Sequence, residues 1–149
     1  MDLTMGTYEA RVLSCRAVDG DTIRCTVDLG WRINAQVVLR LLGVDTPERR
    51  NTSLICAQFV TTQVERWISH VMMSRTSQLW LQSDSIDMYG RSLGDLYVLN
   101  RDNMSMNLLT DWLVRYGYAM RTTSGRRHDW TEQELTKALL TDSVLPHLA

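Results

Sequence analysis

The sequence has almost no excess of charge of either sign. Its 16 lysines and arginines stand against 17 aspartates and glutamates, which gives a formal net charge of -1. The protein therefore has no overall field that attracts polyanions such as nucleic acids. Binding to a polyanion must come from a local arrangement of basic residues.

Lysine is almost absent. Of the 16 basic residues, Lys137 is the only lysine and the other 15 are arginines. The guanidinium group suits forked hydrogen bonds to phosphate. Codon usage in a GC-rich genome explains the same bias, so the arginine content alone does not indicate phosphate binding.

The sequence also lacks targeting and linker segments. No apolar run is long enough to span a membrane, and residues 1–9 have neither the basic nor the apolar region of a secretory signal. We therefore expect a cytoplasmic protein, with secretion after processing left open, and no membrane partner. Without repeats, low-complexity runs or linkers, residues 1–149 are expected to form one domain.

Cysteines are few and odd in number. Cys15, Cys25 and Cys56 lack the spacing of metal ligands and fit reduced, partly buried thiols. If the first two strands form a hairpin, Cys15 and Cys25 would face each other, but a disulfide between them is the less favoured alternative.

What the sequence does contain is centred on the stretch from Arg40 to Glu48. Apolar residues alternate before it, as in a strand with one buried face: Trp31, Ile33, Ala35, Val37, Leu39 and Leu41. Arg40 falls on the opposite, more polar face.

Asp45 and Glu48 follow on a turn bounded by Gly43 and Pro47. A guanidinium and two carboxylates on a stiff turn suit a metal ion and a phosphate. A surface salt-bridge cluster is the alternative.

The remaining pattern predicts five strands and three helices. Expected strands are Tyr8–Val18, Thr22–Leu29, a third that begins at Trp31, Ser77–Ser83 and Ser92–Leu99. Expected helices are Ser53–Met73, a second from Met106 to near Gly117, and a short third that follows the capping box Thr131–Glu134. A helix after the third of five strands is typical of an oligonucleotide-binding barrel. We therefore predict an α+β fold, a five-stranded OB-fold β-barrel with three α-helices.

Three short motifs, in this order, resemble those of the staphylococcal nuclease (thermonuclease) family. They are Asp19-Gly20-Asp21-Thr22, Arg40 to Glu48, and Tyr89-Gly90-Arg91. Each motif alone is weak, but the three together are specific. The resemblance runs from about Tyr8 to Tyr118.

The resemblance implies a calcium-dependent nuclease that hydrolyses DNA and RNA with little sequence preference, with single-stranded regions preferred. Asp21 and Asp45 resemble carboxylate ligands of one Ca2+ ion, and Thr46 resembles the residue that adds a backbone carbonyl. Glu48 resembles the group that activates water. Arg40 and Arg91 resemble the groups that hold the scissile phosphate.

Other residues are expected to support the site. Asp19 would shape its turn and support the metal ligands from behind. Tyr89, Arg126 and Arg127 are candidate substrate contacts, although packing is the more common role for a residue such as Tyr89 and a solvated loop is the favoured alternative for Arg126 and Arg127. Some family members place base-covering tyrosines where this sequence has residues 122–125, so aromatic stacking is not expected there.

Structural roles remain as alternatives for each candidate. Asp21 could be only a turn residue, and Glu48 could pair with Arg49 or Arg50. Arg91 could be a solvated strand end, and Asp95 could lie near the metal or on the outer surface. For the whole chain, the alternative is a non-catalytic OB-fold module that binds nucleic acid or protein. No obligate protein partner is expected.

Overall fold

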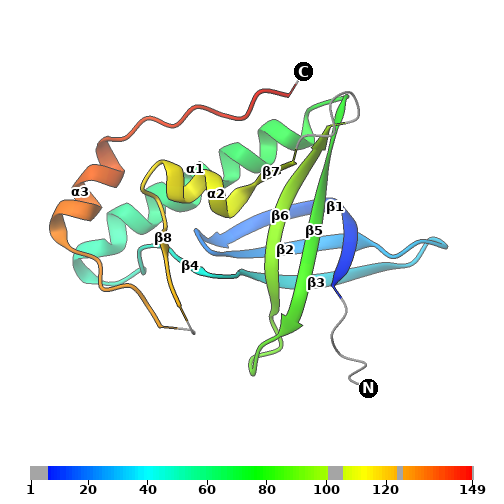
Figure 1. The fold of residues 1–149 in the computed structure, drawn as a ribbon, viewed down its shortest axis with the longest axis horizontal. Coiled ribbons are helices and arrows are strands. Elements are labelled where there is room, and N and C mark those ends of the chain that lie inside the picture. Colours follow the sequence, from blue (N-terminus) through cyan, green and yellow to red (C-terminus); the bar gives the residue numbers. More distant parts are fainter. Residues whose placement is uncertain (1–6, 101–105, 124–125, 149) are drawn as a thin grey trace.

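Five strands form the frame that carries the site (Figure 1). The computed structural model describes residues 7–100, 106–123 and 126–148. The long strands are β1 (Tyr8–Asp19), β2 (Thr22–Asp28), β3 (Asn34–Leu41), β5 (Ser77–Ile86) and β6 (Ser92–Asn100). They pair in the order β3-β2-β1-β5-β6, and β3 pairs with β6 as well. The sheet is therefore closed into a five-stranded barrel, which confirms the predicted fold class.

Closure of the barrel depends on a close approach at Gly94. β3 and β6 run parallel, with Leu41 opposite Gly94, and Leu42 donates a backbone hydrogen bond of 2.9 Å to the Gly94 carbonyl. A Cβ atom at position 94 would lie 1.7 Å from the carbonyl oxygen of Gln82 on β5. Only glycine lets β6 lie this close to β5 while it also pairs with β3.

Three helices lie together on one side of the barrel (Figure 1). They are α1 (Leu54–Met72), α2 (Leu109–Arg115) and α3 (Glu132–Leu140). α1 contacts β1, β5 and α3, and it buries Val60, Val64 and Trp67 completely. Its apolar stripe therefore belongs to the core, as expected. None of the helices in the described residues is long and apolar enough to cross a membrane.

Three short strands complete the fold. They are β4 (Val44–Asp45), β7 (Met106–Leu108) and β8 (Met120–Arg121). β4 pairs with β8 in a separate two-stranded sheet, and β7 adds to the edge of β6. The pairing of β4 with β8 joins the turn after β3 to the segment that precedes α3.

The third strand begins later than predicted. We expected it to start at Trp31, but Gly30, Trp31 and Arg32 have φ angles of 83°, 49° and 62°, which a strand cannot contain. They form the tip of the β2–β3 hairpin, which projects away from the helices (Figure 1). Trp31 is 94% exposed and Ile33 is 52% exposed, so these two residues do not belong to the buried face.

The second helix is also shorter than predicted. Residues from Met106 to Leu108 form β7, because they pair with β6, and α2 begins only at Leu109. The fourth predicted strand, in contrast, continues beyond Ser83 to Ile86. The predicted capping box is present at the start of α3, where Thr131 and Glu134 bond to each other's backbone N–H groups.

The hairpin of β1 and β2 forms as predicted. Cys15 lies opposite Cys25 in this pair, and the three cysteines are free thiols. A side-chain hydrogen bond with Cys15 is the largest cause of a raised pKa at Cys25, and burial and the charge of Cys15 raise this pKa further.

Candidate active site

Two turns meet at the end of β3. The Asp19–Thr22 turn joins β1 to β2, and Thr22 pairs with Arg40 near the end of β3. The Leu41 N–H donates a 2.9 Å bond to the carbonyl of Asp21. Gly20 packs so closely that a Cβ atom there would lie 2.9 Å from Oγ1 of Thr46. The first motif is therefore held directly against the second.

Arg40 lies between the two aspartates expected to bind metal. Its Nη2 atom is 3.4 Å from Oδ2 of Asp21 and 3.4 Å from Oδ1 of Asp45. Its Nη1 atom donates to the carbonyls of Leu41, at 2.8 Å, and Val44, at 3.0 Å. A guanidinium group has five N–H donors in one plane, so Arg40 can contact two carboxylates and two carbonyls at the same time. The guanidinium is thus fixed by backbone oxygens, and both carboxylates are beside it.

Both aspartates are buried. Asp21 is 8% exposed and Asp45 is 1% exposed. Oδ2 of Asp21 accepts a 3.3 Å bond from the Thr46 N–H, and Oδ2 of Asp45 accepts a 2.8 Å bond from the His128 N–H. Burial raises the pKa of Asp45, and the negative charge of Asp21 raises it further, while the bond from His128 and the charge of Arg40 oppose this rise.

Oxygen atoms are the donors that this site offers to a cation. Among the described residues there is no group of three or more His, Cys, Asp and Glu side chains that could hold a metal ion. The carboxylates of Asp21 and Asp45 are nevertheless both buried, and their negative charges repel each other. A hard cation bound between them would reduce this repulsion. With the Thr46 carbonyl they would supply part of a calcium shell, and waters and phosphate oxygens would supply the rest.

Glu48 is held by two arginines. Oε1 accepts a hydrogen bond from Nη1 of Arg127, and Oε2 lies 3.1 Å from Nε of Arg50. The expected alternative partner Arg49 instead bonds to Asp19, with Nε 3.0 Å from Oδ1. Glu48 is therefore ion-paired, and one of its partners comes from the segment before α3.

Arg91 is positioned by a residue that sequence analysis did not assign to the site. Its Nε atom donates a 2.8 Å bond to Oδ2 of Asp87. Oδ1 of Asp87 accepts the backbone N–H groups of Tyr89 and Arg91, each at 2.9 Å. An aspartate that bonds to the backbone two residues later is a common turn signal, so Asp87 could have been identified from the sequence.

One pocket of about 280 Å3 gathers most of the predicted residues. Seven of them line it: Asp19, Asp21, Arg40, Thr46, Glu48, Arg91 and Arg127. Asp45 lies behind Arg40 and does not line the pocket. Tyr89 is 76% exposed and does not line the pocket, and its ring centroid lies 5.4 Å from the guanidinium of Arg91. Arg126 is exposed and does not line the pocket, and Ser124 and Gly125 lie outside the described residues.

Asp95 lies neither in this pocket nor free on the outer surface. Its carboxylate accepts hydrogen bonds from the N–H and hydroxyl groups of Thr110, and from the Leu96 N–H at 2.8 Å. Since Thr110 is in the first turn of α2, Asp95 caps that helix from a neighbouring strand. Burial raises its pKa to about 6.

Comparison with known proteins agrees with these motifs. A family model described as staphylococcal nuclease homologue matches residues 38–139, which is more than half of the chain. The match includes the Arg40–Glu48 stretch and the Tyr89–Arg91 turn, and it begins after the Asp19–Thr22 turn. No curated protein matches the chain.

Proposed function

The chain belongs to the staphylococcal nuclease family, and on this basis we propose that it is a calcium-dependent nuclease that hydrolyses phosphodiester bonds of DNA and RNA. One observation carries the proposal. Asp21, Arg40, Glu48 and Arg91 come from separate parts of the chain, yet they line a single small pocket. Such a pocket has an acidic side for a cation and basic groups for a phosphate.

The acidic side suits one calcium ion. Asp21 in the pocket and Asp45 beside Arg40 would hold it, with the backbone carbonyl of Thr46 as a further oxygen ligand. A bound ion would neutralise negative charge on the phosphate. The buried position of both carboxylates supports this role, because the single positive charge of Arg40, which lies 3.4 Å from each, balances only one of the two negative charges.

The two arginines suit the phosphate. Backbone carbonyls hold Arg40, and Asp87 holds Arg91, so neither guanidinium needs to be ordered when the substrate arrives. Preorganised donors of this kind stabilise the charge that grows on the phosphate during attack. Since they grip the backbone and not the bases, little sequence preference is expected.

Glu48 is the candidate base. It lines the pocket without contacting Arg40, and it is partly exposed, so a water molecule can reach it. Its role would be to accept a proton from that water as the oxygen attacks phosphorus. Its carboxylate is paired with Arg50 and Arg127.

The proposal is tested with purified protein and single-stranded DNA and RNA, with calcium or with a chelator. Wild-type protein should cut both substrates only with calcium. Glu48→Gln should fold normally and reduce kcat by about 10²- to 10⁴-fold, the usual contribution of a general base. Glu132→Gln, which changes an exposed glutamate on α3, is the matched control and should cut like wild type.

A second function is favoured by the ion pairs of Glu48. Both of its carboxylate oxygens are paired with arginines, as in a surface salt bridge that has only a structural role. The alternative is therefore a barrel that binds nucleic acid without cutting it. Binding without cleavage under any divalent ion would establish this alternative and overturn the nuclease proposal.

A further inference from the structure

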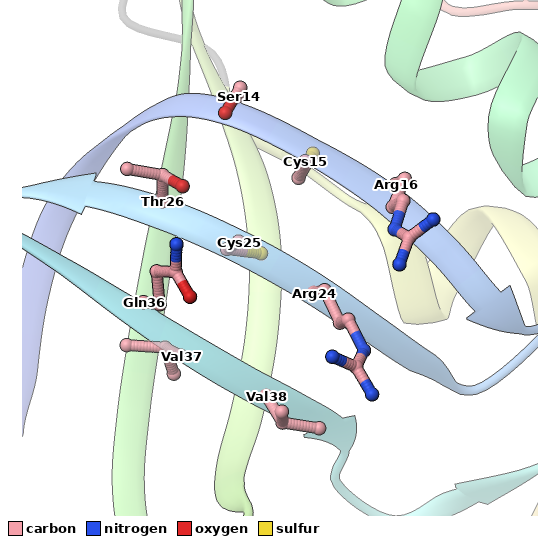
Figure 2. Close-up of a pocket in the computed structure, with 9 residues that line it drawn as sticks. All are labelled: Ser14, Cys15, Arg16, Arg24, Cys25, Thr26, Gln36, Val37 and Val38. Atoms are coloured by element: carbon pink, nitrogen blue, oxygen red, sulfur yellow. The ribbon is translucent and has the colours of Figure 1, made fainter.

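A second hollow lies on the outer face of β1, β2 and β3. It has a volume of about 540 Å3, and Arg16 and Arg24 are its charged residues (Figure 2). Ile23 and Cys25, on either side of Arg24 in the sequence, are 0% and 3% exposed. Because side chains alternate along a strand, Arg24 must point away from the barrel interior.

The two arginines are neighbours without a counter-charge. Arg16 and Arg24 are directly opposite each other in the β1–β2 pair, so their Cβ atoms lie about 5 Å apart. Within the described residues neither side chain forms an ion pair or a hydrogen bond. Like charges directly opposite destabilise a sheet. An anionic ligand would remove this repulsion.

The hollow continues the candidate active site along the same face of the sheet. Thr22 lines the active-site pocket and pairs with Arg40. Arg24 is two residues further along β2 on the same face and pairs with Val38. Two residues of strand span about 7 Å, a distance comparable to that between neighbouring phosphates of an extended strand. Polar side chains of Ser14, Thr26 and Gln36 lie in the same hollow (Figure 2).

We propose that Arg16 and Arg24 bind the phosphates that flank the scissile one, so that a single nucleic-acid strand runs from the active site across the outer face of β1, β2 and β3. This inference rests on the proposed function and adds a subsite to it. It also provides the local basic surface that a protein with a net charge of -1 needs in order to hold a polyanion.

The test measures binding separately from cleavage. A labelled single-stranded oligothymidylate is titrated with protein in the presence of a chelator, and fluorescence anisotropy gives the Kd at several salt concentrations. The double variant Arg16→Gln/Arg24→Gln is compared with wild type. Arg75→Gln/Arg115→Gln is the matched control, because it removes two exposed arginines that line neither pocket.

We expect the double variant to bind about tenfold more weakly at low salt. The slope of log Kd against log salt should fall by about 1.4, which corresponds to two lost phosphate contacts on a single strand. The control should keep the slope of wild type. Cleavage of a dinucleotide, which has no flanking phosphate, should be unchanged in the double variant.

A structural role makes a different prediction. If the arginines only stabilised the sheet, their replacement would lower the melting temperature. We expect it to stay equal or to rise, because repulsion is removed. Equal slopes for the double variant and the control would overturn the inference even if wild type cuts DNA. Wild type that binds with the expected slopes but never cuts would overturn the nuclease proposal and leave the subsite in place.

Discussion

Arg127 donates a hydrogen bond to the carboxylate of Glu48 across 79 positions of sequence. The contact brings the segment before α3 to the turn after β3, and the His128 N–H beside it bonds to Asp45. The candidate base and one buried carboxylate are therefore both covered by this segment. Arg127 is 61% exposed, which would let it exchange Glu48 for a phosphate of the proposed substrate.

The first prediction concerns this exchange. Arg127→Gln should raise KM for an oligonucleotide by about three- to tenfold, because a charged hydrogen bond to phosphate is lost at a largely exposed position. The value of kcat should change by less than about twofold, since Glu48 keeps Arg50 as a partner. Steady-state kinetics on labelled single-stranded DNA measure both constants.

Arg126→Gln is the control for Arg127→Gln. Arg126 is the neighbouring arginine but does not line the pocket, so its replacement should leave KM unchanged. A large fall in kcat with unchanged KM for Arg127→Gln would contradict the exchange. It would show that Arg127 acts by orienting Glu48.

The second prediction concerns the acidic side of the pocket. Asp21→Asn keeps the shape of the side chain but removes a charge beside Asp45, so calcium affinity should fall at least about tenfold. Isothermal titration calorimetry of calcium into the protein gives the Kd without any substrate. Asp19→Asn should have a smaller effect, because Asp19 bonds to Arg49 and does not contact Arg40. Equal calcium affinity for Asp21→Asn and wild type would remove Asp21 from the metal site.

The position of Arg40 could be predicted from the sequence because it depends on local periodicity. The alternation that ends at Leu41 puts Arg40 on the outer face, and the turn after Gly43 follows directly. The same reasoning failed at Trp31. An apolar residue two positions before Ile33 fits a buried face, but the alternation of apolar residues carries no information about φ. The left-handed backbone at Trp31 and Arg32 prevents the strand from starting there.

Contacts between distant segments could not be predicted in this way. Nothing near Arg127 in the sequence indicates that it bonds to Glu48, because the contact depends on how β8 pairs with β4 and where α3 begins. Asp95 shows the same limit. Its partner Thr110 is 15 positions away, and the bond forms only because β7 brings the start of α2 beside β6.

The third prediction uses the raised pKa of Asp95. Its pKa is about 6 in the folded protein and near 4 in the unfolded chain. Between these values the folded state holds a proton that the unfolded state has released, so stability falls as pH rises through this window. The loss is at most about 3 kcal/mol between pH 4 and pH 7.

Asp95→Asn removes this titration. The amide can still bond to Thr110 and Leu96, so the variant should gain stability relative to wild type as pH rises from 4 to 7. Urea unfolding at several pH values measures the difference, and other titrating groups cancel between the two proteins. Parallel pH curves for the two proteins would mean that the pKa of Asp95 is not raised.

The last prediction tests whether barrel closure sustains the site. Gly94→Ala would place a Cβ atom against the Gln82 carbonyl, a backbone group that cannot move as a flexible side chain can. We expect a loss of about 2 to 3 kcal/mol in the free energy of unfolding, the upper range for overpacking. Gly30→Ala is the control, because its Cβ would meet nothing within 4 Å and only its φ of 83° opposes alanine. That cost is about 1 kcal/mol.

The two variants should also differ in their effect on the site. Gly94 lies one residue beyond Leu93, which pairs with Arg40 across the β3–β6 closure. If the clash moves β6 away from β5, Leu93 shifts against Arg40, and Arg40 moves relative to Arg91. Gly94→Ala should therefore lower kcat/KM for DNA even at temperatures where the protein stays folded. Gly30 is at the distant tip of the β2–β3 hairpin, and its replacement should leave kcat/KM unchanged. If Gly94→Ala is as stable and as active as wild type, β5 and β6 can separate without cost, and closure of the barrel is not what holds the two arginines in place.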